Sequence, residues 1–322
     1  PCLMPVGWQQ DAVAAGQRGV NPEDISIYEL HLRDFSVSDI KGSQRYHGKY
    51  LAFTEAERDS VCHLRALRAA GLTHIHLLPV FDIASINEHS DLRFDLDSSK
   101  AAFCQRFPES NIGHRPGPPE MTLREIMACL DPASGDAQCL MNDLGRVDSF
   151  NWGYDPFHYS VPEGSYATDP EGSVRILEFR QMIQALHHMG FCVVMDVVYN
   201  HTHGSGSDEK SVLDKIVPGY YHRLDPVSGS VERSTCCENT ATEAVMFQKL
   251  MEDSLSVWAR DYHIDGFRFD LMGHHPRTGM IKALQVVKQV CPHAYFYGEG
   301  WNFGEVVDDR LFTQATQLNM SG

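Results

Sequence analysis

The amino-acid sequence predicts an α/β fold in which helices cover a parallel β-sheet. Two observations support this prediction. A helical pattern that ends in glycine or proline is followed by a short apolar run, and this alternation recurs along the 322 residues. The apolar runs are nearly continuous, which is typical of strands buried on both faces. The length fits about two domains of roughly 150 residues each, or one α/β barrel of about 250 residues with insertions.

Each predicted element has its own local signal. Thr54 and Glu57 have the spacing of a capping box, which predicts a helix that begins at Thr54 and ends before Gly71. A second helix ends at Gly190, with apolar residues at positions 176, 179, 183 and 186 on one face. We expect helices at 54–70, 173–189, 242–260 and 276–290. We expect five strands, at 26–35, 73–80, 191–199, 266–271 and 295–298.

Two insertions interrupt this alternation. Residues 82–149 follow the second strand and are rich in Pro, Asp and Ser with little periodicity, and residues 201–239 follow the third strand. Long loops inside a compact domain usually have a functional role. Residues 1–24 are expected to be a linker.

Composition excludes several classes of partner. The chain has 27 Lys and Arg against 43 Asp and Glu, a net charge of −16 with neutral histidines. Because nucleic acids and anionic membrane surfaces attract basic proteins, neither is an expected partner. No run approaches the about 20 apolar residues of a membrane-spanning helix. A neutral ligand or substrate fits this charge best, and the compartment stays open.

The cysteine pattern argues against a zinc ribbon. None of the nine cysteines forms a CxxC pair. Cys192 lies in an apolar run and is expected to be a core residue. The neighbours Cys236 and Cys237 could form a vicinal disulfide, but two free thiols are the expected state.

Polar residues stand at the ends of otherwise apolar strands. Alternation along 266–270 places Arg268 and Asp270 on one face, Asp196 interrupts the third strand, and Glu299 follows the fifth. Since ligands bind at the carboxyl ends of parallel strands, these residues and His201 are expected to converge. A pair of carboxylates there suits glycoside hydrolysis. The alternative is structural: Asp196 could be a capping residue or part of a buried ion pair with Arg268.

Other motifs carry less weight. His187 and His188 are expected on a solvated helix end, and His274 and His275 in a loop, so neither pair predicts a metal site. His201 and His203 would point apart on a strand. No phosphate-binding glycine fingerprint and no GxSxG elbow is present.

Taken together, these segments resemble a known family. DVVYNH (196–201), GFRFDLMGH (266–274) and YGEGW (297–301) resemble the motifs of the α-amylase superfamily of glycoside hydrolases. FNWGYDP (150–156) is similar to the YNWGYDP signature of type I pullulanases and limit dextrinases, with Phe150 for the usual Tyr. Segments 161–172 and 211–221 resemble the same subfamily, and the similarity extends from about residue 24 to 304.

The resemblance implies a (β/α)8 TIM barrel, of which about five βα units lie in residues 25–322. It implies retaining hydrolysis of α-1,6-glucosidic linkages in pullulan, amylopectin, starch or glycogen limit dextrins. The implied roles are the following: Asp270 is the nucleophile, Glu299 is the general acid/base, Arg268 keeps the nucleophile ionised, Asp196 supports Arg268, and Tyr154, Asp155, His201, His274 and Trp301 bind substrate. No cofactor is implied. Asn200 lies where many amylases bind calcium, but no metal is assigned.

The sequence also departs from the family pattern. The family has a fourth motif, a His-Asp pair after the fifth strand whose aspartate stabilises the transition state, and no such pair follows Trp301. The upstream starch-binding β-sandwich, to which 1–24 would be the linker, is also absent. We therefore expect a fragment with little turnover alone. Isoamylase or glucanotransferase activity, and non-catalytic glucan binding, are the alternatives. Relatives are exported in bacteria and plastidial in plants.

Overall fold

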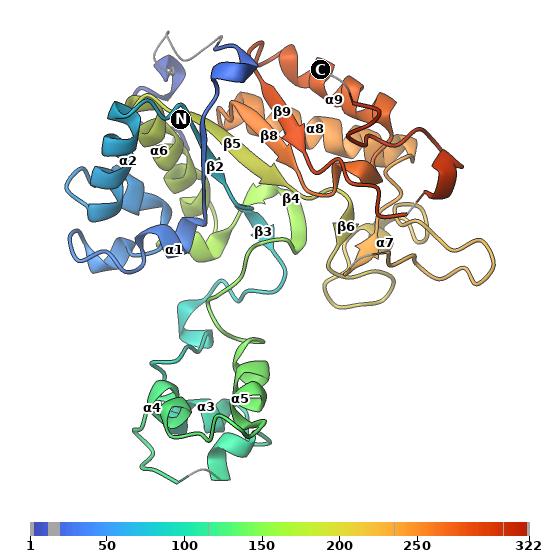
Figure 1. The fold of residues 1–322 in the computed structure, drawn as a ribbon. Helices are drawn as coiled ribbons and strands as arrows, with labels where there is room; N and C mark the ends of the chain where they lie inside the picture. Colours follow the sequence, from blue (N-terminus) through green and yellow to red (C-terminus); the bar gives the residue numbers. More distant parts are fainter. Residues whose placement is uncertain (1–2, 12–19, 115, 235, 305, 321–322) are drawn as a thin grey trace. The chain divides into compact units, whose positions relative to one another are not determined.

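A five-stranded parallel sheet organises the larger part of the chain. The computed structural model describes residues 3–11, 20–114, 116–234, 236–304 and 306–320. The strand order is β1-β2-β5-β8-β9, and every neighbouring pair is parallel (Figure 1). The strands are β1 (Ile27–Leu30), β2 (His74–Leu77), β5 (Cys192–Val197), β8 (Gly266–Phe269) and β9 (Tyr295–Gly298). The predicted parallel sheet is confirmed.

Only the first half of the predicted strand 26–35 forms a strand. β1 ends at Leu30, and a short helix, α1 (Leu32–Ser36), replaces the second half of the predicted segment. The His31 ring accepts the backbone N–H of Asp34 at 3.2 Å, which caps the helix. A capping histidine inside an apolar-polar alternation is therefore the signal that the strand prediction overlooked.

Four helices of this unit match the prediction apart from their ends: α2 (Asp59–Ala69), α6 (Val174–His188), α8 (Val245–Asp261) and α9 (Arg277–Lys288). A further short helix, α7 (Leu213–Ile216), lies within the insertion 201–239 and was not predicted. The predicted capping box at Thr54 is wrong, because the Thr54 hydroxyl donates to the Leu51 carbonyl within a preceding 3-10 turn. α6 packs against β5 with apolar side chains that are fully buried, and α8 packs against α9.

His187 and the N-terminal residues occupy unexpected positions. The expectation that His187 lies on a solvated helix end is wrong, because it is 2% exposed and pairs with Asp11 and Asp265. Trp8 stacks on His263 with ring centroids 4.1 Å apart. Residues 3–11 of the predicted linker therefore pack against the sheet unit, whereas 12–19 lie outside the described residues.

Ser85–Asn151 form a second compact unit. The expectation of an aperiodic loop over 82–149 is wrong, because the described residues of this unit include the α-helices α3 (Lys100–Arg106), α4 (Leu123–Ala128) and α5 (Asp136–Leu144). Their apolar side chains form a cluster of their own around Phe103 and Leu123. Each helix has at most nine residues, too short for a clear helical period. The capping box of Thr122 and Glu125 was a usable signal.

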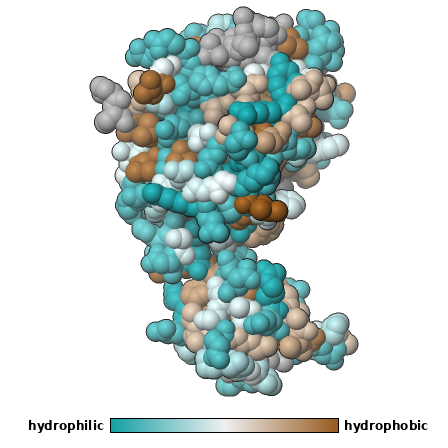
Figure 2. All heavy atoms as spheres, turned by 90° about the vertical axis from the view of Figure 1, so that its left-hand side faces the viewer, coloured by the Kyte–Doolittle hydropathy of each residue, from teal (hydrophilic) through white to brown (hydrophobic). Residues whose placement is uncertain are grey.

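Short antiparallel pairs complete the larger unit. β3 (Phe81–Ile83) pairs with β4 (Pro156–Pro162), and β6 (His201–Thr202) pairs with β7 (Glu238–Asn239). On the face that Figure 2 shows, hydrophilic residues predominate and apolar ones are scattered between them. Among the described helices, none has the length and apolar character that a membrane crossing requires.

Candidate active site

Three neighbouring strands bring the predicted site residues to one edge of the sheet. Asp196 in β5 stands opposite Arg268 in β8 in the parallel register. Asp270 and Glu299 directly follow β8 and β9, and the Glu299 backbone N–H still donates to the Phe269 carbonyl at 3.1 Å. The carboxyl edge of the sheet therefore carries three carboxylates around one arginine.

Arg268 is the centre of this group. Its Nη1 donates to Asp196 Oδ1 at 3.0 Å and Oδ2 at 3.1 Å, and to Asp270 Oδ1 at 3.2 Å. Its Nη2 lies 2.6 Å from Glu299 Oε1. Burial opposes the charge of the guanidinium, but the surrounding carboxylates raise the pKa of Arg268 above its ordinary value. One permanent cation is thus shared by three acids.

Asp196 is the most enclosed of the three acids, with no exposed side-chain surface. Its Oδ2 also accepts the Tyr154 hydroxyl at 2.7 Å and contacts His76 Nε2 at 3.2 Å. Burial and the Asp196 charge raise the pKa of the Tyr154 phenol well above its ordinary value, so this hydroxyl remains a donor. Asp196 and Arg268 do form the ion pair that the structural interpretation anticipated, within a larger group.

Sequence reasoning missed His76. It lies on β2, is 3% exposed, and places its other ring nitrogen 3.4 Å from Glu29 Oε2. A polar residue that alternates with apolar ones inside a buried strand was the available signal, the same one that identified Arg268 and Asp270.

Asp270 is held between Arg268 and Asn200. The Asn200 amide donates to Asp270 Oδ2 and to the Asp270 carbonyl, both at 2.8 Å. Burial, together with the nearby Asp196 and Glu299 charges, raises the pKa of Asp270 to about 6, against the lowering effects of Asn200 and Arg268. A carboxyl with a pKa so near neutrality is typical of groups that take part in chemistry.

Glu299 is held from the backbone side. Its Oε2 accepts the Leu271 N–H at 3.1 Å, and Leu271 has a left-handed backbone with φ of 42°. A non-glycine residue with this conformation marks a constrained turn. Gly298 permits a close approach, because a Cβ there would lie 2.7 Å from the Phe269 carbonyl oxygen. Close packing against Phe269 therefore explains why a glycine precedes Glu299.

His201 is buried next to the acids, at 2% exposure. One ring nitrogen contacts the Asn200 side-chain oxygen and the other lies 3.1 Å from the Tyr154 carbonyl. Burial lowers the pKa of His201, so the ring is neutral and carries a single N–H. Since both neighbours are acceptors, only one contact is a hydrogen bond, and the other nitrogen retains an unused lone pair. At Asn200, the position considered for calcium, the side-chain nitrogen contacts Asp270 and the side-chain oxygen contacts His201.

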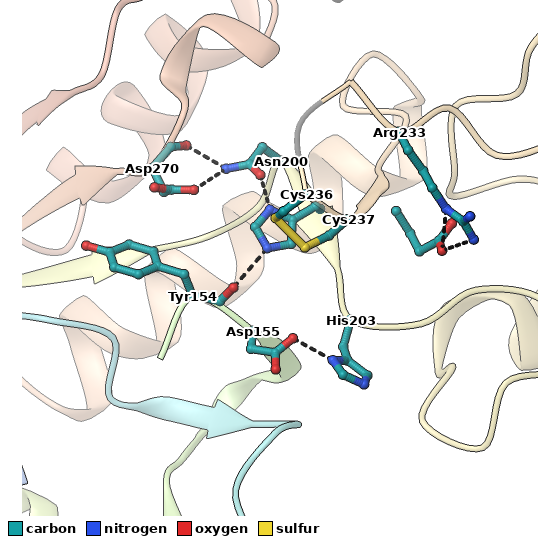
Figure 3. The surroundings of a disulfide bond; sticks show 10 residues. Tyr154, Asp155, Asn200, His203, Arg233, Cys236, Cys237 and Asp270 are labelled. Atoms are coloured by element: carbon teal, nitrogen blue, oxygen red, sulfur yellow. Dashed lines mark hydrogen bonds and ion pairs between the residues drawn. A yellow bond between two sulfur atoms is a disulfide. The ribbon is translucent and has the colours of Figure 1, made fainter. Parts of the chain in front are cut away.

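The remaining predicted residues, Asp155, Trp301 and His274, have other surroundings. Asp155 Oδ1 contacts His203 Nδ1 at 2.6 Å (Figure 3). Trp301 is 59% exposed, so its ring is free to contact a ligand. His274 is 1% exposed in a 3-10 turn rather than in an open loop, and its carbonyl accepts the Thr242 hydroxyl at 2.7 Å.

Cys236 and Cys237 form a disulfide, so the expectation of two free thiols is wrong. In the fold, the loop turns both sulfur atoms toward His201, within 4.8 Å of one of its ring nitrogens and of each other. The expectation that Cys192 is a buried core residue is confirmed.

Three carboxylates around one partly buried arginine, at the carboxyl edge of a parallel sheet, form an arrangement suited to acid/base chemistry. Comparisons with known proteins show which proteins this chain resembles. No family model matches the chain, but a pullulanase of Klebsiella pneumoniae is 45% identical over 99% of the chain and 30% of its own length.

Two further relatives cover the chain as fully. Pullulanase 1, chloroplastic, of Arabidopsis thaliana is 41% identical over 99% of the chain and 31% of its own length. A crystal structure of Klebsiella pneumoniae pullulanase complexed with maltotriose matches with a TM-score of 0.91 and 45% identity, over 100% of the chain and 31% of that structure. The chain is therefore homologous, along its whole length, to part of the pullulanases. It spans about 30% of the length of the curated relatives it matches.

Proposed function

We propose that this protein hydrolyses α-1,6-glucosidic branch linkages in α-glucans such as pullulan, amylopectin or glycogen limit dextrins, with retention of configuration. One observation carries the proposal: Asp270 and Glu299 share the Arg268 guanidinium at the carboxyl edge of the sheet. The pullulanase relatives and the maltotriose bound to one of them support an α-glucan as the substrate. A neutral polysaccharide also suits a chain with a net charge of −16.

In the first step, the ionised Asp270 attacks the anomeric carbon while Glu299 donates a proton to the departing glycosidic oxygen. Hydrogen bonds from Asn200 and Arg268 favour the ionised form of Asp270. This step requires that Glu299 carry the proton that it donates when the glucan is bound.

In the second step, Glu299 acts as a base. It takes a proton from water, the water oxygen attacks the anomeric carbon, and the bond to Asp270 breaks to release the sugar with its original configuration. The Leu271 N–H and Arg268 Nη2 both contact Glu299, which stabilises the carboxylate that this step requires.

The remaining residues would hold the sugar. The Arg268 guanidinium carbon lies 5.8 Å from the centroid of the Tyr154 ring. This ring is the proposed stacking surface for the sugar unit that precedes the cleaved bond. His201, Asp155 and His274 would complete that subsite, and the exposed Trp301 would form the substrate wall. Asp196 acts on Arg268 and is a positioning residue.

We further propose that the five strands belong to a (β/α)8 barrel. A cavity of about 670 Å³ flanks β9, with an apolar lining that includes Met280, Leu284 and Phe296. Apolar surface beside a parallel edge strand is where the next βα unit of such a barrel packs. Isoamylase or glucanotransferase activity on the same barrel remains the alternative, since the superfamily shares these motifs.

The test is reducing-sugar release from pullulan by the full-length protein, with chromatography of the products. We expect maltotriose, and a loss of kcat of about 10⁴-fold or more in Asp270→Asn and in Glu299→Gln. Transfer products would favour a glucanotransferase, and activity that survived both substitutions would refute the assignment. Glucan binding by calorimetry without turnover would indicate a non-catalytic binding protein.

A further inference from the structure

The Cys236–Cys237 disulfide and His201 form a group that the proposed chemistry does not use. The two sulfur atoms and one His201 ring nitrogen all lie within 4.8 Å of one another. Asn200 and Tyr154 contact the His201 ring, and Figure 3 shows both residues together with the disulfide. Two thiolates and an imidazole are the ligands that zinc and other thiophilic cations prefer.

The fold holds these groups together independently of the disulfide bond. His201 begins β6 and pairs with Asn239 of β7, and Glu238, the residue after Cys237, pairs with Thr202. Arg233 donates to Glu238, and the Asn239 amide donates to the Ser234 hydroxyl at 2.7 Å. Opening of the sulfur–sulfur bond would therefore leave both thiols beside His201.

The disulfide is accessible to small reagents. Cys236 is exposed and Cys237 is partly exposed, whereas His201 is buried. Exposed disulfides belong to the labile or regulatory kind more often than buried ones.

We infer that reduction of Cys236–Cys237 creates a three-ligand site for a thiophilic divalent cation of the Zn²⁺ class, formed by both sulfur atoms and the His201 ring. An external dithiol supplies two electrons and two protons, the sulfur–sulfur bond breaks to give two thiols, and the dithiol becomes a disulfide. The cation then displaces both thiol protons, and water completes its coordination.

Occupation of this site inhibits hydrolysis, a consequence that rests on the proposed function. A cation on one ring nitrogen of His201 competes with the contact of that nitrogen, to Asn200 or to Tyr154, and pulls on the ring that makes the other contact. Asn200 in turn holds Asp270. The cation would therefore displace the proposed sugar ligand and disturb the support of the nucleophile.

The test measures bound zinc directly. Full-length protein is reduced with a dithiol, desalted under anaerobic conditions and titrated with ZnCl₂ by calorimetry, with bound zinc counted by atomic emission. We expect one more tightly bound Zn²⁺ per chain in the reduced than in the oxidised protein. The double substitution Cys236→Ser/Cys237→Ser should abolish the difference, whereas Cys62→Ser, which removes an exposed free thiol, should preserve it.

A third variant tests the histidine. His201→Gln should weaken the reduction-dependent binding about tenfold or more. The inference is overturned if reduction adds no zinc, if the double serine variant retains the increment, or if His201→Gln binds as tightly as the wild type. Alkylation of the reduced wild type should block zinc binding, and this experiment tests the thiols even if a variant fails to fold.

Loss of pullulan hydrolysis on zinc addition to the reduced form is the second readout. If no form hydrolyses pullulan, the proposed function fails while the zinc count still decides this inference.

Discussion

Two buried charge clusters lie at opposite ends of the same strands and differ in how their charges balance. At the carboxyl edge, three carboxylates share Arg268. At the amino end, His187 lies between Asp11 and Asp265, with ring nitrogens 2.6 and 3.0 Å from their oxygens. Asp265 also accepts the Val193 N–H at 2.8 Å.

The pKa values report this difference. At the amino end, burial opposes the charges, but the mutual attraction of the groups raises the pKa of His187 to about 9 and lowers that of Asp11 below its ordinary value. At the carboxyl edge, burial and the surplus of negative charge raise the pKa of Asp270 to about 6. The amino-end cluster has two acids for one cation, and the cluster at the carboxyl edge has three. Only the larger surplus is accompanied by a carboxyl with a raised pKa, which is suited to catalysis.

The largest effect should follow from removal of the shared cation. Arg268→Met leaves Asp196, Asp270 and Glu299 without a counter-charge, and we expect the free energy of unfolding at pH 7 to fall by about 3–5 kcal/mol. Urea denaturation measures it. Arg268→Lys, which keeps the charge but not the planar fork, should lose less. A loss below about 1 kcal/mol in Arg268→Met would show that the cluster does not depend on this charge.

The amino-end cluster should show its contribution at alkaline pH. The folded pKa of His187 lies near 9, above its unfolded value of 6.5. Its contribution is therefore fully present below pH 6.5 and is lost as the pH rises through 9, a change on the order of 3 kcal/mol. The stability gap between the wild type and His187→Gln, measured from pH 6 to 10, should narrow accordingly. A gap independent of pH would refute the charged pair, and activity in His187→Gln should match the wild type.

The smallest effect concerns Asp270, the proposed nucleophile. The folded pKa of Asp270 is about 6 against an ordinary value of 3.8, so its ionisation destabilises the folded state as the pH rises through this window. We expect Asp270→Asn, although inactive, to exceed the wild type in stability by up to about 3 kcal/mol at pH 8. The difference should vanish near pH 4, where both side chains are neutral. Thermal unfolding across this range checks it, and a variant less stable at every pH would contradict the expectation.

Local pattern predicted the elements where it was strong and continuous. The helix at α6 and the strands β5, β8 and β9 were predicted within a few residues of their bounds. It failed for Ser85–Asn151, because helices of at most nine residues show little periodicity. It also failed at His187, where a polar residue near a helix end suggested solvent, but Asp11 covers it from a distant part of the chain.

The sequence by itself determined the alternation of buried strands and helices, and hence the edge at which Asp196, Arg268, Asp270 and Glu299 meet. Strand periodicity and parallel topology are enough to place residues at one edge. Only the tertiary structure decided that one arginine serves three acids, that His76 supports Asp196, and that Cys236 and Cys237 pair beside His201. Some of these features join side chains more than one hundred residues apart in the sequence, such as His76 and Asp196. Burial at the site also sets the charge states of its side chains, which no local sequence pattern encodes.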